Sequence, residues 1–168
     1  MRSGYKVTKA RGFSLFEMII VIAVVGILAA AAIPSYLDVK DEAKESIILN
    51  TWQSLVATNY AAYGEALLEG KDGGRQSLNG LALWNGNIVM KENNLRHAFE
   101  TNLRVMDLHF FQLPVEQDET IQHGLYVLHE EDYQAYQSSG VLPECFVVAI
   151  QRQQESGKPV IDANTENC

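Results

Sequence analysis

The chain begins with a sharp contrast between apolar and polar positions. Within residues 13–33 the only charged side chain is Glu17, whereas the 135 residues from Pro34 onward mix apolar and polar positions. At ~1.5 Å per residue, a helix over the 21 residues from 13 to 33 is ~32 Å long and matches a hydrocarbon core of ~30 Å. We therefore expect an apolar membrane-anchor helix over residues 13–33 and a globular domain over residues 34–168.

The pattern after Pro34 predicts an amphipathic helix over residues 35–69, which Gly70 is expected to end. One face of this helix carries positions at steps of three and four residues: Ile48, Trp52, Leu55, Asn59, Ala62 and Ala66. Joined across Pro34, the two segments form one helix of more than fifty residues. Its apolar first half can be buried only in lipid or against copies of the same chain.

The remaining pattern is weaker and predicts a small antiparallel sheet. Residues 79–94 are expected to form a loop with at most a short strand, and residues 93–104 a second short helix. A strand over residues 108–113 is the alternative near that helix. The predicted strands are residues 121–129, residues 145–151 and an edge strand at residues 159–162. The expected fold is α+β, with a long N-terminal α-helix packed on this sheet.

Charge is distributed as unevenly as hydrophobicity. Arg2, Lys6, Lys9 and Arg11 lie in the first 12 positions, which hold no acidic residue. The other 156 residues carry nine basic and 21 acidic residues, a net charge of −12. The positive flank predicts a cytoplasmic N-terminus and an acidic domain across the membrane. Because an acidic domain repels phosphate, nucleic acid is not expected as a partner.

Glu17 is the residue that an ordinary anchor does not explain. An acidic side chain costs about 2.5–3.5 kcal/mol at the centre of a membrane, and no basic residue lies within residues 13–33 to pair with it. Cleavage before Phe13 would create an α-amino group on the same helix face. The ammonium of a neighbouring copy would then neutralise Glu17 and set the axial register of an assembly. The alternative is a carboxylate that reaches the lipid headgroups.

A family signature contains this glutamate. The segment Gly12-Phe13-Ser14-Leu15-Phe16-Glu17, followed by an apolar helix, resembles the processing motif of the type IV pilins. Gly26 and Pro34 also lie where these pilins usually carry glycine and proline, and the resemblance implies a helix kink there. It covers about 25 residues and is closer to the type IVa group than to the group with long leaders. Beyond Pro34 the likeness is one of architecture.

The resemblance implies a set of roles and partners. A prepilin peptidase would cut between Gly12 and Phe13, remove the basic leader of residues 1–12, and methylate the new amino group of Phe13. Glu17 would register the subunits during assembly. The implied partners are identical or related pilin subunits, the peptidase, the inner-membrane pilus assembly machinery, and the membrane before assembly. The precursor would sit in the bacterial inner membrane with a periplasmic domain, and would then enter an extracellular pilus.

Cys145 and Cys168 are the only cysteines, and 22 residues separate them. In an exported domain an even pair of cysteines is typical of a disulfide, with two free thiols or a metal pair as alternatives. A bridge of this size stabilises by ~3 kcal/mol in the chain-entropy model. Type IV pilins often carry such a C-terminal bridge, so the resemblance favours the disulfide.

We find no pattern of residues that indicates catalysis. The four histidines (His97, His109, His123 and His129) have no metal-ligating spacing, and the acidic runs at residues 116–119 and 130–132 are expected to be solvated loops. We therefore expect no enzyme, no cofactor and no metal. The function implied by the resemblance is a major or minor subunit of a type IV pilus, for adhesion or motility. The alternatives are a pseudopilin of type II secretion, and a secreted or membrane-anchored binding module.

Overall fold

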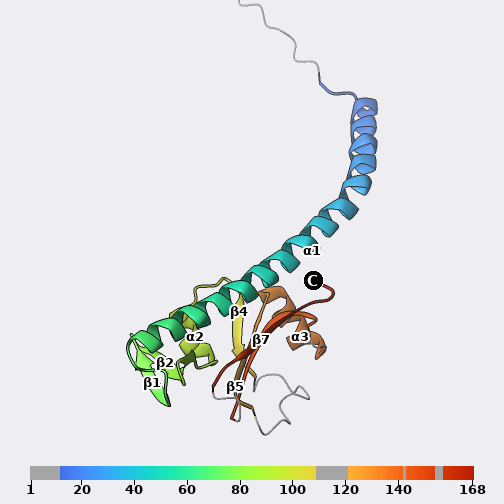
Figure 1. The fold of residues 1–168 in the computed structure, drawn as a ribbon. Helices are drawn as coiled ribbons and strands as arrows, with labels where there is room; N and C mark the ends of the chain where they lie inside the picture. The colour runs from blue at the N-terminus through green and yellow to red at the C-terminus, as the bar shows by residue number, and fades with distance from the viewer. Residues whose placement is uncertain (1–11, 109–120, 142, 154–156) are drawn as a thin grey trace, which may run out of the picture. The chain divides into compact units, whose positions relative to one another are not determined.

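The computed structural model describes residues 12–108, 121–141, 143–153 and 157–168. The chain divides into two compact units, Met1–Lys40 and Asp41–Cys168. One long helix, α1 (Leu15–Leu68), runs from the first unit into the second (Figure 1). It contains residues 15–33 of the predicted anchor segment and nearly all of the predicted amphipathic helix, which confirms that one continuous helix crosses Pro34.

A C-terminal cap ends α1 where the sequence predicts. Gly70 takes a positive φ of 66°, its backbone N–H donates to the carbonyl of Leu67 at 3.3 Å, and the N–H of Lys71 donates to the carbonyl of Ala66 at 2.8 Å. These two bonds form a Schellman motif, which satisfies the last helical carbonyls and favours glycine at the left-handed position. The chain then turns into the first sheet.

The first sheet is antiparallel and consists of three short strands in the order β1-β2-β3. The strands are β1 (Arg75–Leu78), β2 (Leu81–Trp84) and β3 (Asn87–Ile88). Two-residue turns, Asn79-Gly80 and Asn85-Gly86, join them, and all four residues have positive φ. This is the type I′ geometry for which Asn-Gly is the preferred sequence. The expected loop over residues 79–94 was therefore wrong, because these turns fold it into two hairpins.

The second sheet has four antiparallel strands in the order β4-β5-β6-β7. Its members are β4 (Arg104–Asp107), β5 (Ile121–Leu128), β6 (Cys145–Arg152) and β7 (Val160–Thr165). The strands predicted at residues 121–129 and 145–151 are confirmed, and the predicted edge strand extends to Thr165. Most of the alternative strand at residues 108–113 lies outside the described residues.

Two helices of the second unit differ from expectation. The helix α2 (Glu92–Ala98) ends six residues earlier than predicted, and the chain becomes extended at Phe99 before β4 begins. A further helix, α3 (Glu130–Ser139), occupies the acidic run that was expected to be a loop. That expectation was wrong because Glu130, Glu131 and Asp132 form its first turn, where negative charge is favourable.

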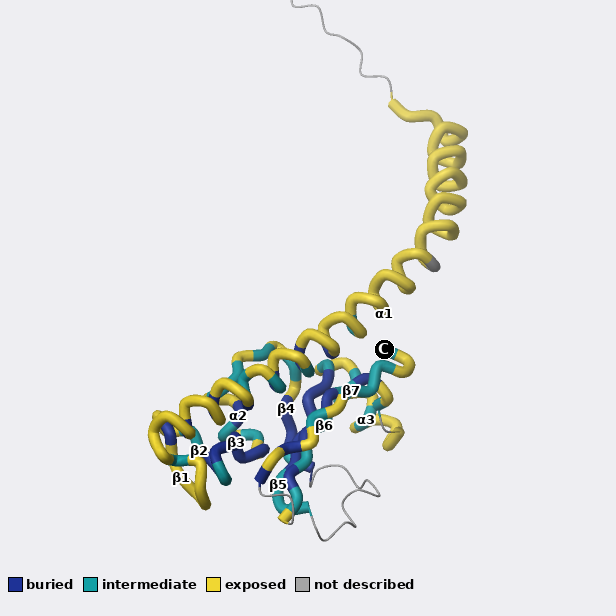
Figure 2. The backbone as a smooth tube through the Cα atoms, viewed as in Figure 1, coloured by how far each residue is buried: buried dark blue, intermediate teal, exposed yellow. Residues whose placement is uncertain are grey.

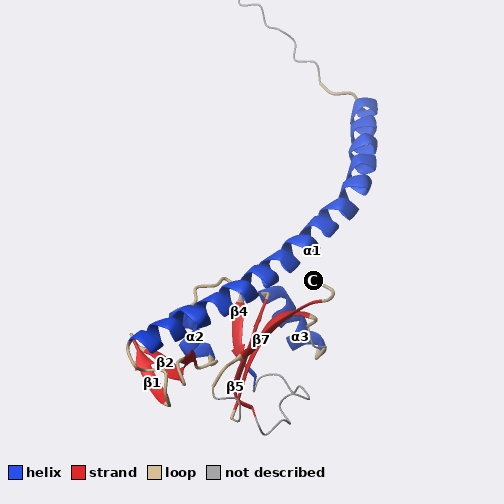
Figure 3. Cartoon of the chain, viewed as in Figure 1, coloured by secondary structure: helices blue, strands red, loops and turns tan. Residues whose placement is uncertain are grey.

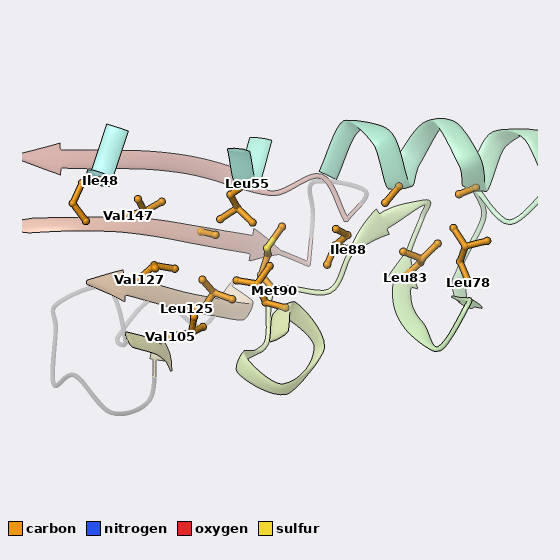
Figure 4. Close-up of a cluster of buried hydrophobic side chains, with 14 of the residues drawn as sticks. Ile48, Leu55, Leu78, Leu83, Ile88, Met90, Val105, Leu125, Val127 and Val147 are labelled. Carbon is orange, nitrogen blue, oxygen red and sulfur yellow. The ribbon is translucent and has the colours of Figure 1, made fainter. Parts of the chain in front are cut away.

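The main core lies between α1 and the four-stranded sheet. Ile48 and Leu55 of α1 and Leu125, Val127 and Val147 of the sheet are fully buried together (Figure 4). Along β6, alternate residues face this core, as the period of a strand requires.

The opposite face of the same sheet carries a second apolar cluster. Tyr126 and Leu128 of β5 are buried there, and the half-buried Phe146 of β6 packs with them. Tyr133 and Tyr136 of α3 pack against this cluster, so the sheet has helices on both faces (Figure 3). A long N-terminal helix followed by small antiparallel sheets is the expected α+β fold.

Candidate functional site: the exposed apolar half of the long helix

The first half of α1 has an unusual surface for a helix. Its residues are exposed from the first turn onward (Figure 2). The apolar residue Leu15 is 79% accessible and Ile27 is 72% accessible. Among the described residues, α1 is the one helix long and apolar enough to span a membrane. An apolar surface of this size is stable in lipid or against other protein, because exposed apolar area is unfavourable in water.

Glu17 forms a capping box at the start of this helix. The backbone N–H of Ser14 donates to Glu17 Oε2 at 2.8 Å, and the backbone N–H of Glu17 donates to Ser14 Oγ at 3.2 Å. The two residues thus satisfy each other's free backbone donors. This capping role was not predicted, although Ser-x-x-Glu before an apolar run is its signature.

The other predicted residues of the segment are also accessible. Phe13 is 78% exposed and precedes the first helical turn, and Gly12 next to it is exposed and lies outside any helix or strand. A Cβ atom at Gly26 would meet nothing within 4 Å, so this glycine leaves a bare patch of backbone on the helix. The backbone at Pro34 is helical. The kink expected at Gly26 and Pro34 stays a prediction.

The two cysteines form the expected disulfide. Cys145 begins β6 and bonds to Cys168, and their Cα atoms lie 4.9 Å apart. Asn167 donates a side-chain hydrogen bond to Glu144, which holds the same two segments together. The bridge therefore attaches residue 168 to the start of β6, an inner strand of the four-stranded sheet.

The described histidines occupy separate places. His97 is exposed on α2, the ring of His123 packs edge-on against Trp84 at 6.3 Å, and His129 Nε2 lies 3.3 Å from the carbonyl oxygen of Lys44. His109 lies outside the described residues. Within the described ranges, no three His, Cys, Asp or Glu side chains are placed to hold a metal ion together.

Comparison with known proteins identifies the N-terminal segment. Residues 7–33 match the family described as the prokaryotic N-terminal methylation motif. The type IV major pilin protein PilE1 of Neisseria gonorrhoeae is 46% identical over 55 residues, which cover 32% of this chain and 33% of that protein. The resemblance to the type IV pilin family is confirmed.

Other pilus proteins match a similar length of the chain. The type IV narrow pilus major component PilA5 of Thermus thermophilus is 35% identical over 63 residues, 38% of this chain and 51% of that protein. Fimbrial protein Q of Moraxella bovis is 39% identical over 61 residues, 36% of each chain. The chain thus matches about a third to a half of the length of these relatives. No solved structure matches it.

Proposed function

We propose that this chain is a structural subunit of a type IV pilus. Its N-terminal helix anchors the subunit first in the inner membrane and then in the core of the filament. The observation that carries the proposal is the exposed apolar half of α1, which coincides with the segment that matches the methylation motif. Burial of this surface against copies of the helix drives assembly, because each buried CH₂ contributes ~0.8 kcal/mol.

Processing prepares the subunit for assembly. The peptidase cuts between Gly12 and Phe13 on the cytoplasmic side and methylates the amino group of Phe13. Both residues are exposed and precede the helix, so the helix does not block a protease from reaching the bond between them. The basic leader of residues 1–12 is removed in this step, and methylation leaves the amine charged.

Glu17 acts twice in this proposal. In the single chain it caps its own helix through Oε2, and the structure gives the second oxygen no partner among the described residues. That oxygen accepts a hydrogen bond from the Phe13 ammonium of the neighbouring subunit. Pairing two opposite charges in the apolar filament core stabilises one axial register over the others, since any other register leaves a buried charge unpaired.

The experiment compares Glu17→Gln with Glu42→Gln in cells that assemble the protein. Both positions lie exposed on α1 and carry a carboxylate, but Glu42 belongs to the second unit. We expect Glu17→Gln to reduce sheared surface filaments at least tenfold and to leave the amount of membrane-bound subunit unchanged. Glu42→Gln is expected to assemble like the unaltered chain. Full assembly of the Glu17 variant, with unchanged subunit spacing in images, would disprove the register role.

Intact mass of the filament subunit tests the processing step separately. The expected mass is that of a chain beginning at Phe13 with one additional methyl group. A Gly12→Val variant is expected to keep residues 1–12 and to remain in the membrane. A mature protein that retains the leader would contradict the proposal for this step alone.

A pilus is favoured over the type II secretion pseudopilus by two observations. The similar proteins named above are pilins and a fimbrial protein, and the chain carries a C-terminal disulfide of the kind common in pilins. Adhesion or motility is the corresponding cellular role. None of these names describes an enzyme, which is in keeping with a structural protein.

A further inference from the structure

A cavity of about 450 Å³ opens on the surface of the second unit. Its volume lies within the range of small-molecule sites, ~300–1,000 Å³. Four segments that are distant in sequence line it: α1, the loop after it, the β2–β3 hairpin, and the segment before β7. The lining residues are Tyr60, Tyr63, Asp72, Asn85, Asn87 and Lys158. Filament assembly through the first half of α1 requires none of them.

Hydrogen bonds fix the hairpin wall of this cavity to α1. The buried side chain of Asn59 donates to Asn87 Oδ1 at 2.9 Å and accepts from the backbone N–H of Ile88 at 3.0 Å. The turn residue Gly86 lies so close to the helix that a Cβ there would be 2.8 Å from Cδ2 of Tyr63. The hairpin and the ring of Tyr63 therefore form one packed wall.

The wall that carries Lys158 is anchored through the neighbouring residue, Gly157. The carbonyl of Gly157 accepts a hydrogen bond from the buried Gln151 side chain at 2.7 Å. A Cβ at Gly157 would lie 2.6 Å from the carbonyl oxygen of Trp84, so this segment lies directly against the hairpin. The walls of the cavity are thus built before any ligand arrives.

The exposed groups of the cavity combine aromatic and charged chemistry. Tyr60 is 60% exposed and Tyr63 36% exposed, although both carry large apolar rings. Within the part of the chain that the structure describes, neither Asp72 nor Lys158 forms an ion pair or a hydrogen bond. A carboxylate accepts several hydroxyl hydrogen bonds and an ammonium donates three. Tyrosine adds an apolar face with a polar tip.

One class of ligand matches this set of groups. A pyranose has an apolar C–H face that packs on an aromatic ring, and hydroxyl groups at its rim that both donate and accept. The net charge of the chain, −8, disfavours an anionic polysaccharide, and the carboxylate of Asp72 disfavours a carboxylated sugar beside it. We propose that this cavity binds a neutral pyranose saccharide, with its ring on Tyr60 and its hydroxyls at Asp72 and Lys158.

Saturation-transfer NMR tests this site in the full-length chain, held in dodecylphosphocholine micelles because these lack sugar headgroups. The probes are the methyl β-pyranosides of glucose, galactose and N-acetylglucosamine, with methyl glucuronide as the charged comparison. We expect transfer to the ring protons of at least one neutral glycoside. Tyr60→Ala and Asp72→Asn should each weaken its binding about tenfold, a loss of ~1.4 kcal/mol.

Tyr36→Ala is the matched control, since Tyr36 is a 70% exposed tyrosine of the same helix outside the cavity lining. It should bind the glycoside as the unaltered chain does. Asp72→Asn keeps the shape of an exposed loop residue, so it tests the site even where Tyr60→Ala perturbs folding. Absence of transfer to every neutral glycoside overturns the proposal. So does binding that both cavity variants retain, or binding to the glucuronide alone.

Discussion

At the scale of single residues, Gln151 shows how a buried polar group connects distant segments. Its side chain is fully buried in β6, donates to the carbonyls of Ile88 and Gly157 at 2.9 and 2.7 Å, and accepts from the N–H of Met90 at 2.8 Å. One amide thus satisfies backbone groups of three residues that lie outside its own strand. Loss of this amide would leave them buried without partners, which is costly in an apolar core.

We therefore expect Gln151→Leu to lower the free energy of unfolding by about 3 kcal/mol, since each unsatisfied buried group costs about 1–3 kcal/mol. The measurement is urea unfolding in detergent micelles, followed by the fluorescence of Trp52 and Trp84. Gln53→Leu is the control, because Gln53 is exposed on α1 and its replacement should change stability by less than about 0.5 kcal/mol. Equal stabilities of the two variants would show that the amide contributes nothing specific.

At the scale of elements, the two Asn-Gly turns offer a matched comparison. Gly80 and Gly86 each take the second position of a type I′ turn, with φ of 87° and 76°. A Cβ at Gly80 would meet no atom within 4 Å, whereas a Cβ at Gly86 would collide with the ring of Tyr63. The two glycines thus share a backbone requirement and differ in packing.

Gly80→Ala should therefore cost about 1–2 kcal/mol of unfolding free energy, the price of a left-handed residue with a side chain. Gly86→Ala should cost more than that, because the hairpin must also move away from α1. Amide hydrogen exchange at Ile88, whose N–H bonds to Asn59, reports this movement directly. Faster exchange in the Gly80 variant than in the Gly86 variant would contradict the assigned packing.

The elements differ in how far sequence predicts them. The β-branched apolar run at residues 146–150 predicted β6. The Asn-Gly pairs carried a signal for hairpins that the broader Asn- and Gly-rich composition obscured. In contrast, α3 has no buried residue and an acidic start that also suits a loop. Tertiary contacts hold it: Lys44 lies 3.2 Å from Glu131, and the Arg104 guanidinium lies 4.7 Å from the centre of the Tyr133 ring.

The candidate sites also differ in how far the sequence predicts them. Glu17 and its exposed helix were predictable because a run of apolar residues with one acid is a local pattern. The disulfide needed only a cysteine count and an exported domain. The cavity beside Tyr60 was not predictable, since Asp72 and Lys158 approach one another only after the hairpins and β7 have folded. A local pattern thus predicts the exposed apolar helix, whereas the cavity proposed to bind a saccharide depends on tertiary structure.

At the scale of the whole molecule, the two units have different sources of stability. All of the described core residues belong to the second unit, Asp41–Cys168. They include Ile48 on α1 and Val147 and Ala149 in β6. The disulfide lies in the same unit and adds ~3 kcal/mol by restricting the unfolded chain. The first unit has a helix with exposed apolar side chains and no buried residue among those described. Its helix depends on lipid or neighbouring copies for burial.

A chain beginning at Ser35 tests this division. Because the second unit holds its own core and disulfide, we expect this shortened chain to be a folded monomer in water without detergent, with the near-ultraviolet circular dichroism of the full chain. The processed chain, which begins at Phe13 and keeps the whole helix, should sediment as assemblies unless detergent covers this helix. Its apolar surface is unfavourable in water. Sedimentation velocity distinguishes the two. A dispersed full-length monomer in plain buffer would remove the physical reason for a filament, and an aggregated shortened chain would show that the second unit needs the first.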